Sequence, residues 1–230
     1  MSELVLAMSC HEQPWALQQW FPQHHLKEPL PKSVAENPDE VERRLAATRC
    51  YAGGVLRSYQ EPVLAQGAAT ETYRLIWSPS FESTVVIRVE ESRGRYVAIV
   101  KRDVSKASEL SGKFMTTVRE VSASDFAGIR AAAANAGCWA PSHTCRAESS
   151  IERLPGGEAA WVVVDGDSWL LEGARGSEHW GVTVHSPAGS PFLVTCEAIV
   201  RAARAEGEVR LRSRSTSESL EALTGDGGVE

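Results

Sequence analysis

The chain of 230 residues has no apolar run approaching the roughly 18 to 20 residues that a membrane-spanning helix needs, so no transmembrane segment is predicted. It also lacks a basic excess, because 24 Lys and Arg stand against 30 Asp and Glu, a net charge of −6. This balance disfavours a surface that neutralises phosphates, so nucleic acid is not an expected partner. Neither a Walker loop nor a Gly-x-Gly-x-x-Gly turn occurs, and no cofactor is predicted.

Cysteine is scarce, and its odd count predicts free thiols in a reducing compartment, which favours the cytoplasm. One alternative concerns the N-terminus, where the apolar stretch Leu4 to Ser9 precedes Cys10 as in a crude lipoprotein cleavage site. If the true start lies upstream, the chain would be exported or lipid-anchored at Cys10. The stretch has no basic flank and is short for a signal core. The five cysteines are Cys10, Cys50, Cys138, Cys145 and Cys196.

The composition, 43% hydrophobic and 23% charged, fits one globular domain with loosely attached ends. Residues 1–36 are rich in proline, glutamine and histidine and predict an irregular arm. Trp15 and Trp20 in this arm either dock back on the domain or offer an apolar contact to a partner protein. A single domain is expected over residues 37–205, followed by a disordered polar tail over 206–230.

Three helices are predicted from their caps and apolar spacing. Asn37-Pro38-Asp39-Glu40 supplies an N-cap, a first-turn proline and acids, and predicts a helix to about Tyr51 that Gly53-Gly54 ends. The other two helices run from a cap at Ser124 or Asp125 through alanines 131–134 to Gly137, and from Phe192 to about Ala205.

A two-residue period marks the strands, and short links between them favour antiparallel pairing. Ser92-Arg93-Gly94 predicts a tight hairpin turn. The fold class is therefore α+β, an antiparallel sheet of about six to seven strands with helices packed on one face. The strand candidates are Tyr73 to Trp77, Thr84 to Glu90, Arg95 to Arg102, Phe114 to Val121, Ser168 to Ala174 and His179 to Val184, with the apolar run Ala160 to Val164 before the last two.

The last two strands form a hairpin whose register can be predicted. If Gly176-Ser177 makes the turn, Arg175 faces Glu178, and each pair of facing residues has numbers that sum to 353. Trp169 and Trp180 then lie on one side, which must be the core face. The other side collects Ser168, Leu170, Glu172, His179, Gly181, Thr183 and His185.

On that second side Glu172 lies diagonal to His179, so the carboxylate can orient an imidazole that acts as a base. Ser168 and His185 are further candidates for a catalytic role. The alternative interpretation is an exposed sheet face with a weak ion pair, worth about 0 to 1 kcal/mol.

Two short motifs have the residue types of a functional site. Asp165-Gly166-Asp167-Ser168 resembles the first block of the GDSL hydrolases, but the downstream asparagine and Asp-x-x-His of that family are missing, which favours chance. Cys138, His143 and Cys145 have zinc-ligand chemistry, yet no second pair stands at finger spacing. A buried Cys138 beside Trp139 is the simpler interpretation, with a loop disulfide only in an exported protein.

The hairpin also carries a family resemblance. Asp165-Gly166-Asp167-Ser168-Trp169-Leu170-Leu171-Glu172-Gly173, followed by Ser186-Pro187, is similar to a group of bacterial proteins with an Asp-Gly-x-x-Trp-x-x-Glu-Gly pattern, and Tyr73-Arg74-Leu75-Ile76-Trp77 resembles the same group. The likeness covers about residues 55–205. It implies one bacterial domain and brings no assigned reaction.

These observations favour a non-catalytic binding or protein-interaction domain, at most like an immunity protein that neutralises its partner. The contact would be made through the arm with Trp15 and Trp20. The alternative is a serine or acid/base hydrolase that uses the face with Ser168, Glu172 and His179.

Overall fold

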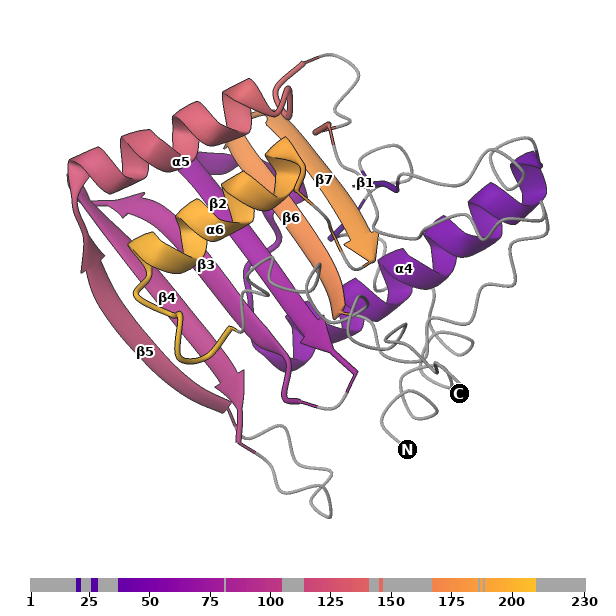
Figure 1. Cartoon of the computed structure of the whole chain (residues 1–230), viewed down its shortest axis with the longest axis horizontal. Coiled ribbons are helices and arrows are strands. Elements are labelled where there is room, and N and C mark those ends of the chain that lie inside the picture. Colours follow the sequence, from indigo (N-terminus) through magenta and orange to yellow (C-terminus); the bar gives the residue numbers. More distant parts are fainter. Residues whose placement is uncertain are drawn as a thin grey trace, which may run out of the picture.

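The fold is a seven-stranded sheet with helices on both faces (Figure 1). The computed structural model describes residues 20–21, 26–28, 37–80, 82–104, 114–140, 145–146, 167–185, 187 and 189–209. The strand order is β1-β7-β6-β2-β3-β4-β5, and every neighbouring pair is antiparallel except β1 and β7. The predicted α+β class with a mainly antiparallel sheet is therefore confirmed.

The six strands predicted by residue range all form, with ends that shift by a few residues. The run 160–164 lies outside the described residues. The strands are β1 (Leu26–Lys27), β2 (Ala68–Pro79), β3 (Val85–Ser92), β4 (Arg95–Asp103), β5 (Phe114–Val121), β6 (Asp167–Gly176) and β7 (Glu178–His185).

Both predicted hairpins are present. Arg93 and Gly94 connect β3 to β4 with φ angles of 54° and 76°, the left-handed pair that a two-residue turn between twisted strands requires. In the second hairpin Arg175 faces Glu178 and Trp169 faces Val184, so the predicted register is confirmed. Trp169 and Trp180 lie in the same buried cluster, as the register requires.

Helices α5 (Ala123–Asn135) and α6 (Pro191–Ala202) cover one face of the sheet (Figure 1). Ser122, rather than Ser124 or Asp125, caps α5, because its hydroxyl accepts a hydrogen bond from the backbone N–H of Asp125 at 3.0 Å. The main core lies between these helices and the sheet. Its large members are Tyr73, Leu75, Trp77, Ile87, Phe126, Ile129, Trp169, Leu171, Trp180, Phe192 and Ile199.

Helix α4 (Pro38–Ser58) packs on the opposite face, so the helices do not share the one face that was predicted. It also continues past Gly53-Gly54, where the sequence predicted its end. The extra turns bury Val55 and Leu56, and burying each such side chain stabilises by about 1.5 to 3 kcal/mol. That gain exceeds the roughly 1 kcal/mol that a glycine costs inside a helix. In the described part of the chain, no helix is long and apolar enough to cross a membrane.

The ends of the predicted domain also differ from expectation. Trp20, Phe21 and Leu26 are buried in the core beneath α4, and Leu26 begins a two-residue strand parallel to β7. These arm residues therefore dock back on the domain. At the other end Val209, in the predicted tail, is buried in the main core. Trp15 and residues 210–230 lie outside the described residues.

Candidate functional site

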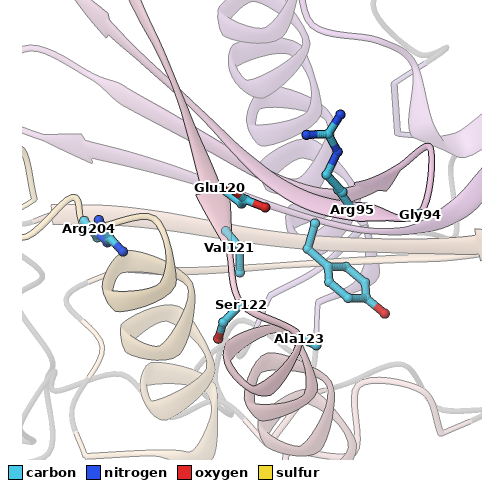
Figure 2. A pocket seen from close by; sticks show the side chains of 8 residues that line it. Gly94, Arg95, Glu120, Val121, Ser122, Ala123 and Arg204 are labelled. Atoms are coloured by element: carbon cyan, nitrogen blue, oxygen red, sulfur yellow. The ribbon is translucent and has the colours of Figure 1, made fainter.

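A shallow groove lies where the β3–β4 turn, the end of β5 and the start of α5 meet (Figure 2). Its volume is about 460 Å³. Figure 2 shows Arg95 and Arg204 on different sides of the groove, with Glu120 between them. These charged groups do not converge on one point, so the groove offers no defined ligand position.

The polar side of the β6–β7 hairpin has a different environment from the expected one. Glu172 is fully buried, and His179 and Thr183 are 5% and 1% exposed. The interpretation as a solvated sheet face with a weak surface ion pair is therefore wrong. This side lies in the layer of α4, with the arm residue Phe21 against the His179 ring. These three polar residues are therefore buried between the sheet and the layer of α4.

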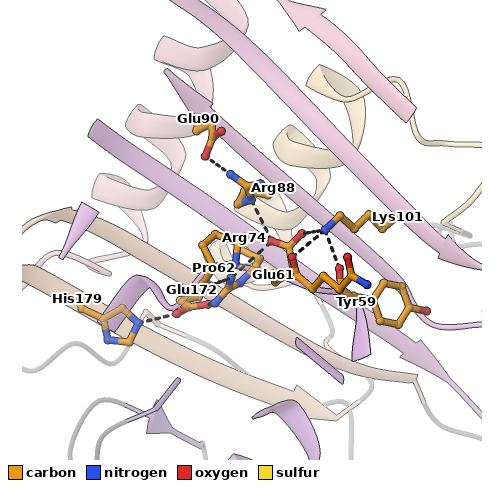
Figure 3. A network of polar contacts seen from close by, with 10 residues as sticks. Tyr59, Glu61, Pro62, Arg74, Arg88, Glu90, Lys101, Glu172 and His179 are labelled. Carbon is orange, nitrogen blue, oxygen red and sulfur yellow. Dashed lines mark hydrogen bonds and ion pairs between the residues drawn. The ribbon is translucent and has the colours of Figure 1, made fainter. Parts of the chain in front are cut away.

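Glu172 belongs to a buried polar network, at the end beside His179 (Figure 3). Its Oε1 lies 2.7 Å from His179 Nε2, which confirms the predicted proximity of the two side chains. Its Oε2 accepts hydrogen bonds from Arg74 Nε at 2.8 Å and Nη2 at 2.5 Å. Arg74 comes from the neighbouring strand β2, directly opposite Glu172, and its side chain is fully buried. Both carboxylate oxygens are thus occupied.

The network continues through Glu61, which lies in the loop after α4. Arg88 Nε donates to Glu61 Oε2 at 2.9 Å, and Lys101 Nζ lies 2.7 Å from Oε1. Burial alone would raise the pKa of Glu61, but Arg88, Lys101 and Arg74 together hold this pKa below its ordinary value. Glu61 is therefore a carboxylate in the interior, stabilised by three cations.

The formal charges of this network balance. The network is defined by the cations Arg74, Arg88 and Lys101, the carboxylates Glu61, Glu90 and Glu172, and the imidazole of His179. Three cations match three carboxylates when His179 is neutral. A general base must reach the proton it removes, and the lone pairs of Glu172 already face Arg74 and His179. This arrangement holds the loop after α4 against the sheet, with the side chains of Glu61, Arg74 and Glu172 fully buried.

The other two candidates, Ser168 and His185, lie at the open end of the hairpin. They face each other across β6 and β7 on the same side of the sheet as Glu172. His185 is half exposed, and its Nε2 lies 3.8 Å from Glu28 Oε1. Glu28 directly follows β1, His185 ends β7, and Ser168 lies in β6. Because β1, β7 and β6 are neighbours in the sheet, the Glu28 carboxylate, the His185 imidazole and the Ser168 hydroxyl form a row across the three strands.

Glu28 itself is a buried acid with an unmet hydrogen-bonding capacity. Its side chain is 8% exposed, and among the described residues its Oε2 and the Thr183 hydroxyl have no hydrogen-bond partner. Burial raises the pKa of Glu28, opposed by the charges of His185 and Arg44. At 3.8 Å the Glu28 carboxyl and the His185 imidazole are close enough for electrostatic attraction but too far apart for a direct hydrogen bond.

Cys138 and Cys145 are joined in a disulfide, with both residues fully buried. Disulfide sulfurs are not thiolates, so Cys138 and Cys145 do not offer the zinc ligands that the sequence suggested. His143 lies outside the described residues. Cys50 is also disulfide-bonded, whereas Cys196 is a free and buried thiol, so the expectation of free thiols throughout is wrong. No group of three or more potential metal ligands occurs among the residues whose positions the structure gives.

Sequence reasoning missed six members of these sites, which are Arg74, Arg88, Lys101, Glu61, Glu90 and Glu28. Arg74 carries a signal that could have found it, because a charged residue inside the apolar run Tyr73 to Trp77 indicates a buried ion pair. Lys101 is likewise a charged residue directly after an apolar run, Val97 to Val100 in β4. Glu61 and Glu28 lie in irregular segments, and no pattern in the sequence marks them.

None of the protein-family models, curated proteins or solved structures compared with this chain matches it. The resemblance to the bacterial Asp-Gly-x-x-Trp-x-x-Glu-Gly group thus stays an expectation from the residues.

Proposed function

We propose that this chain is a non-catalytic binding domain that associates with protein through the open edge of strand β5. The observation that carries the proposal is the exposure of this strand. Met115 and Val118 are 50% and 63% exposed, and Val118 is the most exposed large apolar side chain in the described part of the chain. Exposed apolar groups on the edge strand of a sheet favour association by strand addition.

Two further observations support a binding role. The pair Glu172 and His179 is closed inside a charge-balanced network, so it does not serve as the acid/base centre of the hydrolase alternative. Trp20, which the sequence offered as a contact for a partner, is 6% exposed within the core. The proposed surface therefore moves from the arm to β5.

The test compares the full-length chain with its Val118→Lys variant as immobilised baits in a bacterial extract, with quantitative mass spectrometry of what is retained. Val194→Lys is the matched control, because Val194 is 51% exposed on α6, away from the edge. The proposal expects at least one protein, this chain included, to be retained by the original and control baits and lost from Val118→Lys. Equal retention by all three baits would contradict it.

A second candidate is the hydrolase alternative, moved to the open end of the hairpin. The row of Glu28, His185 and Ser168 is the specific observation in its favour, since a base oriented by an acid can activate a hydroxyl. A fluorophosphonate probe tests it directly. Labelling that disappears in both Ser168→Ala and His185→Ala would support a nucleophilic serine, and the absence of labelling in the original chain would reject it.

We also propose an oxidising compartment, the exported alternative, in place of the cytoplasm. The disulfides at Cys50 and between Cys138 and Cys145 support this location, because such bonds persist mainly where thiols are oxidised. Trapping thiols with a maleimide under denaturing conditions, in protein taken directly from its natural host, tests it. Labelling of Cys138 and Cys145 only after reduction is expected, and labelling without reduction would overturn the proposal.

A further inference from the structure

The two edges of the sheet are protected very differently. At one edge the two-residue strand β1 and the arm residues cover β7. At the other edge β5 pairs with β4 without a bulge over eight residues, and none of the described strands pairs with its outer side (Figure 1). The strand contains no proline, lysine or glycine, and its two charged residues, Arg119 and Glu120, lie near its end, so residues Phe114 to Val118 lack the usual devices that stop an edge from pairing.

Hydrogen bonding between β3 and β4 shows which backbone groups of β5 are unpaired. The N–H of Asp103 donates to the Thr84 carbonyl, so the odd-numbered residues of β4 bond to β3 and the even-numbered ones bond to β5. Because Asp103 bonds to β3, Asp103 and the facing Phe114 of β5 are a pair without backbone hydrogen bonds between them. By alternation, Phe114, Thr116, Val118 and Glu120 direct their N–H and C=O groups to the open edge.

We infer that the partner of this edge is a second copy of the chain, paired antiparallel through β5 about a two-fold axis at Val118; this rests on the proposed function. In this register Val118 faces its own copy, and Met115 faces Val121. Thr116 faces Glu120, so the outward backbone groups of these residues meet in bonded pairs. A two-fold interface must be self-complementary, and this register matches apolar with apolar.

The neighbouring registers are not self-complementary. An axis at Arg119 places two guanidinium groups opposite each other, and like charges at facing positions are destabilising. An axis at Thr117 places Glu120 opposite Phe114, which stacks on Tyr59 in the core beneath α4. Charge and polarity therefore select Val118 as the centre. The resulting dimer has one continuous sheet that runs through both chains.

Sedimentation equilibrium of the purified full-length chain across the micromolar range tests this pairing. Val118→Lys sets two ammonium groups face to face, and we expect it to weaken the dimer about tenfold or more. Thr116→Pro removes an outward N–H without removing a bond to β4, so it blocks pairing and spares the ladder. Val194→Lys is the control, and far-UV circular dichroism checks that each variant is folded.

The inference expects a concentration-dependent dimer in the original chain and in Val194→Lys, and a shift to monomer in both edge variants. A chain that stays monomeric, or a dimer that neither edge variant weakens, would overturn it. The bait experiment separates the two proposals. If the purified chain is monomeric while another protein is still lost from the Val118→Lys bait, the proposed function stands and the self-pairing does not.

Discussion

Replacement of Glu172 by glutamine tests the buried network most severely. The substitution keeps the shape of the side chain and removes the charge that Arg74 faces at 2.5 to 2.8 Å, with both side chains fully buried. Removing one partner of a buried pair typically costs about 3 to 5 kcal/mol, because the remaining charge stays in the interior. In the variant, Arg74 would keep two partners, Glu61 Oε2 at 3.5 Å and the Pro62 carbonyl at 2.7 Å. The expected loss of unfolding free energy is therefore near the lower end of this range, about 3 kcal/mol.

We therefore expect Glu172→Gln to lower the free energy of unfolding by about 3 kcal/mol and the melting temperature by about 6 to 12 °C. Urea unfolding followed by circular dichroism measures the first quantity. The matched control is Glu178→Gln in the exposed pair with Arg175, whose side chains are 55% and 48% exposed. That change is expected to cost about 0 to 1 kcal/mol.

A double variant separates the loss of the pair from the loss of packing. Replacing Arg74 by methionine and Glu172 by leucine removes both buried charges, and such exchanges are often neutral or stabilising. We expect the double variant to be more stable than Glu172→Gln alone. A loss below about 1 kcal/mol in Glu172→Gln, or a double variant at least as unstable as the single one, would refute the account of a closed network.

Two other substitutions test packing and burial. A Cβ at Gly173 would lie 2.5 Å from the Trp180 ring, so Gly173→Ala is expected to lower the free energy of unfolding by about 1 to 3 kcal/mol. Gly128 has open space around it, so Gly128→Ala is expected to raise that free energy by about 0.5 to 1 kcal/mol. Urea unfolding compares the two variants, and equal effects would contradict the packing of Gly173 against Trp180. The raised pKa of Glu28 destabilises the fold once its carboxyl ionises, so Glu28→Gln is expected to stabilise at pH 7. This gain is expected to vanish below about pH 4.3, where the unfolded chain also protonates the carboxyl; a gain independent of pH would contradict the burial of the charge.

Local patterns predicted the sheet well, because its signals are short in range. The two-residue turn fixes the β6–β7 register, and alternation then separates Trp169 and Trp180 from Glu172 and His179. The same alternation marks strand β5, whose predicted ends match the observed ones.

The environment of the polar face was not predictable from the same patterns. An alternating strand has the same sequence whether its polar side faces water or a buried network, and Arg74 is 98 residues away from its partner Glu172. Helix α4 covers this face only because it continues past Gly53-Gly54. Glycine has a low helix propensity, so the local sequence disfavours this continuation, and the burial of Val55 and Leu56 stabilises it. Long-range burial, rather than local preference, thus decides between a wet face and a closed interior.

Amide hydrogen exchange resolved by residue along β5 tests the central claim most directly. The amides of Thr117 and Arg119 bond to β4 and are expected to exchange slowly at every protein concentration. The amides of Thr116, Val118 and Glu120 face the open edge, and the account predicts that they exchange slowly in concentrated protein and rapidly after dilution. Exchange of these three amides at one rate across all concentrations would contradict the claim that this edge is where the protein associates.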